Sequence, residues 1–250
     1  MLITGATDGI GERIARNLAG QGATVLVHGR NEERVQAAGE RIGGRWQPAV
    51  ADLGSFAAVR ALAGSVSVLD GLVNNAGVGF GTAPSRDART EDGHEVTWQV
   101  NVLSAFLLTV LLHDVLADGG GRVVHMSSGV ASSGAVDLDS PDAPRGVDAY
   151  RQSKVALMLL AREMGDRYRG AGIDVNAVSP GWIATKMGGS GGGDLDRGAD
   201  TATWLLTDPS LEGTTGRYFA DRREQRPNPQ TEDAEARRRL WELASSAVGL

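Results

Sequence analysis

Short apolar runs alternate with helical segments along most of this chain of 250 residues. The runs that fit strands lie at 2–4, 23–28, 46–51, 71–74, 122–127, 173–178 and 217–219. Helical segments lie between them, at about 10–20, 31–43, from 55, at 92–116, 150–169, 199–206 and 232–243. Such units form right-handed crossovers, which build a parallel sheet between two helical layers. The alternation predicts an α/β fold, a doubly wound parallel sheet of about seven strands with helices on both faces.

Length and composition narrow the class of protein. A domain usually holds about 100 to 200 residues, so we expect residues 1–250 to form a single domain. The net charge of −6 disfavours nucleic acid and anionic membranes, which bind basic patches, and leaves small molecules as the expected partners. The chain has no cysteine, which excludes disulfides and thiol catalysis. Its four histidines lack metal-binding spacing, so no metal site is expected.

No segment marks the chain for a membrane or for export. The longest apolar stretch, 102–112, is far shorter than the roughly 20 residues that span a bilayer. The N-terminus lacks the regions of a signal peptide, so we expect a cytoplasmic protein with no membrane partner. Only three residues separate Met1 from Gly5, where a strand usually holds about five or six. We therefore expect a short first strand or a natural chain that begins upstream.

A glycine-rich loop joins the first predicted strand to the first predicted helix. Its glycines stand at positions 5, 9 and 11, in the spacing Gly-x-x-x-Gly-x-Gly. Backbone N–H groups of such a loop can approach a pyrophosphate at the helix N-terminus, where the helix dipole also favours an anion. The loop predicts a Rossmann-type dinucleotide site, and the alternative is a tight turn that binds nothing.

The end of the second predicted strand bears on the choice of cofactor. An acidic residue there would accept the ribose hydroxyls of NAD, and a basic residue would favour the 2′-phosphate of NADP. The chain has Gly29, Arg30 and Asn31 at this place, so NADP(H) is favoured. Two observations keep NAD(H) open as the alternative. Arg30 could instead be a surface residue that binds no ligand. The negative charge of Asp8 in the glycine loop would also oppose an extra phosphate.

Tyr150 and Lys154 form the strongest candidate for chemistry. Residues four apart lie on one face of a helix, so the phenol and the ammonium can act together. A free tyrosine has a pKa of about 10, which a nearby cation lowers. Tyr150 is thus predicted to exchange protons near neutral pH. The alternative for the pair alone is a solvated helix face.

Taken in order along the chain, these motifs resemble the short-chain dehydrogenase/reductase family. The matching elements are Thr4-Gly-x-x-x-Gly-x-Gly11, Asp52-Leu53, Asn74-Asn-Ala-Gly77, Ser128, Tyr150-x-x-x-Lys154 and Pro180-Gly181. The run at 92–96 and the closing Gly216-Arg-Tyr-Phe219 resemble its retinol-dehydrogenase-like and bacterial ketoreductase branch. An interval of 150 − 128 = 22 positions between Ser128 and Tyr150 is longer than is common in the family.

The resemblance implies roles for individual residues. The implied catalytic residues are Asn101, Ser128, Tyr150 and Lys154. The implied cofactor-binding residues are Gly5, Thr7, Asp8, Gly9, Ile10, Gly11, Arg30, Asn31, Asp52, Leu53, Asn75, Ala76, Gly77, Tyr150, Lys154, Pro180, Gly181, Ile183 and Thr185. In that scheme Tyr150 protonates the carbonyl oxygen, Ser128 holds the same oxygen, Lys154 grips the nicotinamide ribose, and Asn101 supports a water. Ser128 is chosen over Ser127 by the family pattern alone, and a buried asparagine bonded to backbone is the alternative for Asn101.

The chain is therefore interpreted as an NAD(P)-dependent oxidoreductase that interconverts a ketone or aldehyde and its alcohol, an NADP-preferring carbonyl reductase. We expect the insert at 129–149 to be an ordered surface loop and the glycine-rich loop at 186–198 to be a lid or linker. Both would border an apolar substrate together with Trp182. The alternative function is a catalytically silent dinucleotide-binding or sensing protein. The helices at 92–116 and 150–169 permit a homodimer or homotetramer, although packing on the sheet explains their apolar residues equally well.

Overall fold

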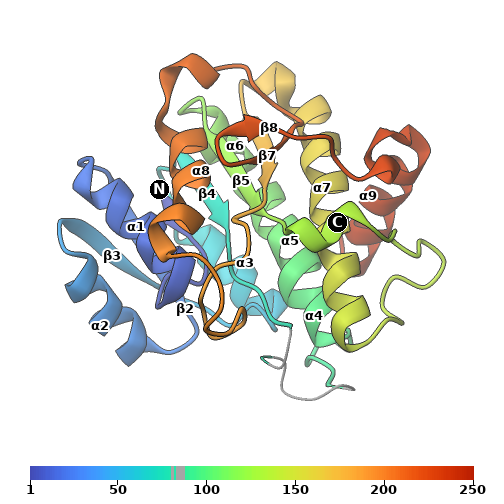
Figure 1. Cartoon of the computed structure of the whole chain (residues 1–250), viewed down its shortest axis with the longest axis horizontal. Coiled ribbons are helices and arrows are strands. Elements are labelled where there is room, and N and C mark those ends of the chain that lie inside the picture. The colour runs from blue at the N-terminus through green and yellow to red at the C-terminus, as the bar shows by residue number, and fades with distance from the viewer. Residues whose placement is uncertain (80–81, 83–87) are drawn as a thin grey trace.

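Within the part of the chain that the structure describes, one open sheet of eight strands organises the molecule (Figure 1). The computed structural model describes residues 1–79, 82 and 88–250. The strands are β1 (Leu2–Ile3), β2 (Thr24–Gly29), β3 (Arg45–Val50), β4 (Gly71–Asn74), β5 (Arg122–Met126), β6 (Asp174–Val178), β7 (Tyr218–Ala220) and β8 (Arg223–Glu224). They lie in the order β3-β2-β1-β4-β5-β6-β7-β8. Strands β1 to β7 are all parallel, which confirms the predicted Rossmann-type, doubly wound sheet.

The last strand was missed by the sequence analysis. Strand β8 pairs antiparallel with β7 at the edge of the sheet. A two-residue turn joins them, and both of its residues have positive φ, 48° at Asp221 and 54° at Arg222. Such turns usually carry Asn-Gly or Asp-Gly, so this one has no sequence signal.

Helices cover both faces of the sheet (Figure 1). Helices α1 (Gly9–Gly20), α2 (Glu32–Ile42) and α8 (Leu195–Thr207) pack on one face. Helices α3 (Phe56–Gly64), α5 (Ser104–Leu111), α7 (Gly146–Tyr168) and α9 (Ala234–Val248) pack on the other. The shorter helices are α4 (Val96–Trp98), the π-helical Gln99–Leu103 and α6 (His113–Ala117), and 3-10 turns lie at Gly129–Ser132, Arg169–Ala171, Pro209–Leu211 and Pro229–Glu232.

Alternating side chains of the strands fill the two cores. Leu2 and Leu72 point into the core under α5 and α7, and their neighbours Ile3 and Val73 point into the core under α1 and α8. This follows from the two-residue period of a strand that is buried on both faces. Strand β1 therefore occupies the centre of the sheet although it holds only two residues.

Two predicted helices differ in the structure. The segment expected to be one helix at 92–116 begins at Val96, is π-helical through Gln99–Leu103 and breaks at Leu112. The terminal helix α9 extends to Val248 and packs on α5 and α7, where the Trp241 ring meets that of Phe106 edge-on at 4.9 Å. It therefore covers part of the surface expected for pairing, and the oligomeric state stays a prediction. Among the helices of the described residues, none is long and apolar enough to cross a membrane.

Candidate active site

The candidate residues gather at the carboxyl end of the parallel strands. Strand β1 lies between β2 and β4, so the strand order reverses there, and doubly wound sheets bind their ligands at this place. The candidates follow the strands directly: the glycine loop after β1, Arg30 after β2, Asn75 after β4, Ser128 after β5 and Pro180 after β6.

Ser128 and Tyr150 are brought together by β5 and α7. Ser128 is half-buried, and its side chain hydrogen-bonds to that of the buried Tyr150. The neighbouring Ser127 is buried, and its Oγ donates to the carbonyl oxygen of Lys154 at 2.7 Å. The structure thus separates the two serines, which spacing could not do. Ser128 faces the phenol, while Ser127 ties the strand to the helix.

Burial governs the titration of Tyr150 and Lys154. Burial lowers the pKa of Lys154 to about 8. Burial also raises the pKa of Tyr150 above its ordinary value, and the hydrogen bond to Ser128 opposes this shift. The prediction that Lys154 lowers the pKa of Tyr150 is therefore wrong for this structure. Lys154 Nζ donates to the carbonyl oxygen of Met126 at 2.8 Å and lies 5.3 Å from the centroid of the Tyr150 ring.

Asn101 lies in the π-helical segment and holds two elements of the site together. Its Oδ1 accepts from the backbone N–H of Val78 at 2.8 Å, and its Nδ2 donates to the carbonyl oxygen of Val78 at 3.0 Å. Nδ2 also lies 3.0 Å from Ser153 Oγ on α7. The amide is thus bonded to backbone, as the alternative reading expected, and it fixes the chain after β4 against α7.

Gly79 is a site residue that the sequence analysis missed. It has φ +151°, and a Cβ added there would lie 2.3 Å from Cδ2 of Tyr150. Only glycine therefore lets the chain pass this close to the phenol ring. The glycine that follows Val78 was visible in the sequence, but nothing marked which ring it faces.

The turn after β4 supports the glycine loop. Thr4 Oγ1 accepts from the backbone N–H groups of Asn75 and Ala76, both at 2.9 Å, and Asn75 Nδ2 donates to the carbonyl oxygen of Thr4 at 2.8 Å. The N–H of Gly5 donates to Nδ1 of His28 at 3.1 Å. Asn75 and Ala76 thus hold the loop in shape, and Gly77 lies beside Asn101 and Lys154.

The beginning of α1 fits a dinucleotide pyrophosphate. Asp8 is the N-cap residue, yet its side chain makes no cap hydrogen bond. The first-turn N–H groups of a helix have no partner within the helix, so here they remain available to an anion. A Cβ added to Gly9 would meet only Thr185 Cγ2, at 3.7 Å, so the backbone is open for close approach. Thr7, two residues before this glycine, and Ile10, directly after it, are half-buried.

The adenosine end of the candidate site is formed by residues after β2 and β3. Arg30 is exposed, and Asn31 caps α2 by accepting from the N–H of Arg34 at 2.8 Å. Asp52 Oδ1 accepts from the N–H of Gly54 at 2.8 Å, and Leu53 is buried. Asn31 and Asp52 are exposed like Arg30, but their side chains already serve the local backbone.

Comparison with known proteins decides the family. The model of the short chain dehydrogenase family matches residues 1–194. The chain belongs to this family. Retinol dehydrogenase 13 of Mus musculus is 33% identical over 283 residues, which cover 100% of this chain and 84% of that protein. The Streptomyces sp. (strain C5) protein named "Putative daunorubicin C-13 ketoreductase DnrU" is 36% identical over 274 residues, which cover 100% of this chain and 92% of that protein.

Solved structures agree with this assignment. A crystal structure of a protein from Mycobacterium paratuberculosis has a TM-score of 0.86 at 29% identity and covers 99% of this chain and 92% of that one. A gluconate 5-dehydrogenase of Burkholderia cenocepacia, in complex with NADP and tartrate, has a TM-score of 0.70 at 25% identity and covers 93% and 94% of the two chains. The predicted resemblance, including the branch, is confirmed, and this short-chain dehydrogenase is an NAD(P)-dependent oxidoreductase.

The loop after β6 in this short-chain dehydrogenase is more ordered than its glycines suggested. Ile183 forms a bridge with Gly193, and Thr185 with Gly189. The indole N–H of Trp182 donates to the carbonyl oxygen of Gly188 at 2.8 Å. Residues 195–198, predicted to be loop, belong to α8. Pro180 and Gly181 lead directly into this structured loop, so Ile183 and Thr185 lie beside the glycine loop.

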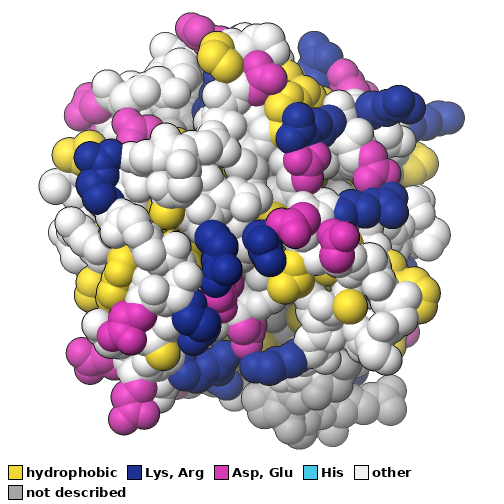
Figure 2. Space-filling view, turned by 60° about the vertical axis from the view of Figure 1, so that its left-hand side comes forward, with side chains coloured by type: hydrophobic (Ala, Val, Ile, Leu, Met, Phe, Trp, Pro, Cys, Tyr) yellow, Lys and Arg dark blue, Asp and Glu magenta, His cyan; other side chains and the backbone are white. Residues whose placement is uncertain are grey.

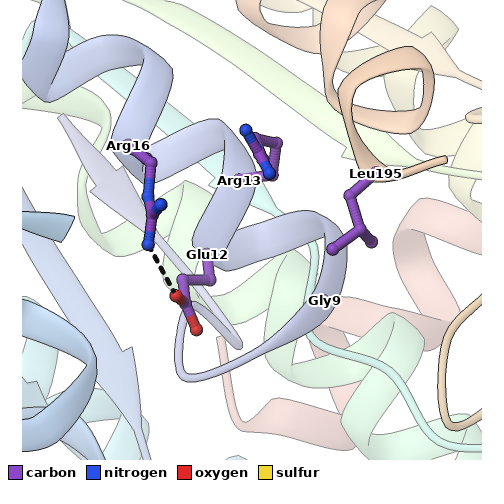
Figure 3. A pocket seen from close by; sticks show the side chains of 5 residues that line it. All are labelled: Gly9, Glu12, Arg13, Arg16 and Leu195. Carbon is purple, nitrogen blue, oxygen red and sulfur yellow. Dashed lines mark hydrogen bonds and ion pairs between the residues drawn. The ribbon is translucent and has the colours of Figure 1, made fainter. Parts of the chain in front are cut away.

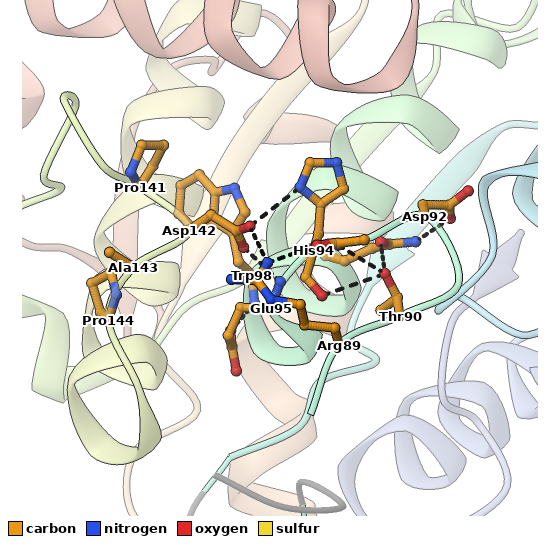
Figure 4. Close-up of polar contacts among 12 residues, drawn as sticks. Arg89, Thr90, Asp92, His94, Glu95, Trp98, Pro141, Asp142, Ala143 and Pro144 are labelled. Atoms are coloured by element: carbon orange, nitrogen blue, oxygen red, sulfur yellow. Dashed lines mark hydrogen bonds and ion pairs between the residues drawn. The ribbon is translucent and has the colours of Figure 1, made fainter. Parts of the chain in front are cut away.

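The insert at 129–149 is anchored on several sides, and its last residues, 146–149, which were predicted to be loop, belong to α7. Asp142 accepts from the N–H of Glu95 at 2.6 Å and from Arg89 at 3.1 Å (Figure 4). Gln152 accepts from the N–H of Asp137 at 2.9 Å and donates to the carbonyl oxygen of Pro141 at 2.7 Å. The side chain of Gln152 leaves α7 on a different side from that of Tyr150, because residues two positions apart in a helix are rotated by about 200° around its axis. The middle of the insert therefore packs away from the phenol.

Proposed function

We propose that the protein is an NADP(H)-preferring carbonyl reductase that reduces a ketone or aldehyde to its alcohol. The hydrogen bond between Ser128 and Tyr150 carries this proposal, because it places a hydroxyl and a phenol where one substrate oxygen can contact both. The bound nicotinamide cofactor supplies the hydride. Buried Lys154 stands one helical turn from Tyr150 and would hold the nicotinamide ribose.

The titration of the phenol suits proton donation. A pKa above the ordinary value keeps the proton on Tyr150 at neutral pH. When the carbonyl becomes an alkoxide, Tyr150 gives this proton to the oxygen, and Ser128 stabilises the developing negative charge by a hydrogen bond. Alcohol oxidation would run through the same phenolate in reverse, so the two hydroxyls serve both directions, and an excess of NADPH over NADP would drive the reduction.

Arg30 supports the choice of NADP(H). It is exposed directly after β2, where a basic side chain can meet a 2′-phosphate. Replacing Arg30 with Asp should reverse the ratio of the NADPH and NADH dissociation constants, measured by fluorescence of the reduced cofactor. An unchanged ratio would assign the phosphate contact to another residue.

The substrate side supports a moderately apolar carbonyl compound. Trp182 is 69% exposed, and Val147, three residues before Tyr150 on α7, is also exposed. Since the middle of the insert is bound to Gln152 and Glu95, only its two ends, next to Ser128 and around Val147, would border the substrate. The names of the relatives, retinol dehydrogenase and daunorubicin ketoreductase, fit a bulky apolar substrate. The cytoplasmic location stays a prediction.

Consumption of NADPH with a panel of apolar ketones and aldehydes tests the function. Tyr150→Phe should lower turnover by about 10²–10⁴-fold, the range for loss of a general acid, and leave the dissociation constant of NADPH nearly unchanged. Cofactor binding without turnover by the unaltered protein across the panel would instead favour the sensing protein.

A further inference from the structure

A small group of charged side chains joins the glycine loop to the loop after β6. Oδ2 of Asp8 accepts from Arg34 Nη2 at 2.8 Å and from Lys186 Nζ at 2.6 Å. Arg34 belongs to the first turns of α2, while Lys186 lies 178 positions beyond Asp8 in the chain. We call Asp8, Arg34 and Lys186 the Asp8 cluster. Through it, the loop at 182–193 is fastened across the beginning of α1.

Apolar contacts place the same loop over the glycine loop. A Cβ added to Gly198 would lie 2.8 Å from Cγ1 of Ile183 and 3.2 Å from Cγ1 of Ile10, so these three residues pack closely. Thr185 faces Gly9 at the start of α1. Lys186 therefore reaches Asp8 from a segment that already covers the expected pyrophosphate position.

Asp8 is the carboxylate that binds both cations of the Asp8 cluster. Arg30, four residues before Arg34, adds a third cation, and Glu32 and Glu33 in the first turn of α2 add two further carboxylates, so the neighbourhood is close to neutral. Among the described residues, Arg34 and Lys186 form ion pairs with Asp8 alone. A phosphate monoester has three strong acceptor oxygens and about −1.5 to −2 charge at neutral pH, so it can share these two cations with Asp8.

Glu12, in the first turn of α1, does not compete for these cations. Glu12 pairs with Arg16 at 3.3 Å and with Arg41 at 2.8 Å. Glu12 and Arg16 point outward from α1 and line a shallow hollow with Gly9, Arg13 and Leu195 (Figure 3). Figure 2 shows basic and acidic side chains interspersed over the neighbouring face of the molecule. Arg34 and Lys186 therefore have Asp8 as their ion-pair partner among the described residues.

We propose that Lys186 couples recognition of the 2′-phosphate of NADP(H) to closure of the 182–193 loop. This inference rests on the proposed NADP(H) preference. Asp8 is then not a charge that repels the phosphate, as the sequence suggested, but the residue that positions Arg34 and Lys186 for it. Because the loop also carries Trp182, a phosphate at the adenosine end would hold the substrate wall near the nicotinamide end.

Hydrogen exchange of the 182–193 loop tests this coupling with two probes that differ only in the 2′-phosphate. These are adenosine 2′,5′-bisphosphate and adenosine 5′-monophosphate, each at saturation with the full-length protein. In the unaltered protein the bisphosphate should slow exchange of the loop several-fold more than the monophosphate. Lys186→Met should abolish this difference. Arg34→Met is the matched control: it should weaken bisphosphate binding but retain the difference, since Lys186 still reaches the phosphate.

The outcomes separate the inference from the function on which it rests. Equal extra protection by the bisphosphate in the unaltered protein and in Lys186→Met would overturn the coupling while leaving NADP(H) preference intact. If the unaltered protein binds both probes with the same dissociation constant, NADP(H) preference itself is wrong. Loss of extra protection in Lys186→Met alone supports the role of Lys186 as a positioning residue between phosphate and loop.

Discussion

The two ends of the candidate site are built by different means. At the catalytic end, Lys154 is 4% exposed and Tyr150 is 7% exposed, and short hydrogen bonds to backbone hold the surrounding groups. At the adenosine end, the side chains of Asp8, Arg34 and Lys186 are 47%, 52% and 77% exposed and meet through ion pairs. Buried hydrogen bonds fix a geometry, whereas exposed ion pairs are weak and can exchange partners with a ligand. The proton donor is thus preorganised, and the phosphate contact remains adaptable.

The sharpest test of the buried end compares the two adjacent serines. Ser128→Ala removes the hydroxyl that bonds to Tyr150 and should lower kcat by about 10²–10³-fold, as expected for loss of a donor to a developing oxyanion. Ser127→Ala removes the bond to the Lys154 carbonyl and should cost about 1–3 kcal/mol of unfolding free energy, with kcat changed only a few-fold. Steady-state kinetics and urea unfolding measure both. Equal losses of kcat would show that Ser128 has no special contact with the substrate oxygen.

Acid should weaken the fold through two buried histidines, one behind the glycine loop on β2 and one near Lys154 on β5. Burial lowers the pKa of His28 to about 4 and that of His125 to about 3. Both lie below the ordinary value of 6.5, so the unfolded chain takes up protons first as the pH falls. The contribution of the two neutral histidines to the free energy of unfolding is complete above about pH 6.5. It declines as the pH falls and reaches its minimum below the folded pKa values. The expected loss near pH 4 is about 3 kcal/mol for each histidine.

Urea unfolding at pH 7 and pH 4.5 measures this loss. His125→Leu should make the stability less dependent on pH, because Nε2 of His125 is buried without a partner among the described residues and Asn74 keeps its bond to Thr109. Met126→Leu is the control, since it changes a buried side chain on the same strand that carries no titratable group. An equal effect of the two substitutions would contradict the assignment to the buried ring.

The two ends also differed in how far the sequence predicted them. The catalytic pair was predictable because residues four apart on a helix share a face, and the serine and glycine motifs lie directly after strands. The partners of Asp8 were not, since Lys186 comes from a distant loop whose path depends on packing. The pKa direction of Tyr150 was also missed, because the pattern Tyr-x-x-x-Lys says nothing about burial. Ion pairs between residues far apart in the sequence and the desolvation of buried groups both depend on the fold.

The buried charge of Lys154 should lower the free energy of unfolding. Burial lowers its pKa from an ordinary 10.5 to about 8, so keeping the ammonium charged at pH 7 opposes folding by roughly 3 kcal/mol. Lys154→Met removes this penalty but also the bond to Met126, worth about 1 kcal/mol. The variant should be about 2 kcal/mol more stable by urea unfolding and inactive. For the unaltered protein, stability should rise between pH 8 and 10.5, where the unfolded chain binds more protons. A less stable variant would mean that the ammonium is well solvated in the fold.

A change of ionic strength should affect the two ends of the site differently, and this is the smallest of the predicted effects. Raising the ionic strength shortens the Debye length to about 3 Å at 1 M, so it screens the exposed Asp8 cluster but hardly reaches the buried hydrogen bonds. The dissociation constant of NADPH should therefore rise several-fold between low and high salt, while kcat at saturating substrate and cofactor stays within about twofold. NADH is the matched control, because it lacks the 2′-phosphate and should lose less affinity. If NADH and NADPH weaken equally, the salt acts on the pyrophosphate at α1 rather than on Arg30, Arg34 and Lys186. If kcat falls with them, the proton donor is more exposed to solvent than its burial indicates.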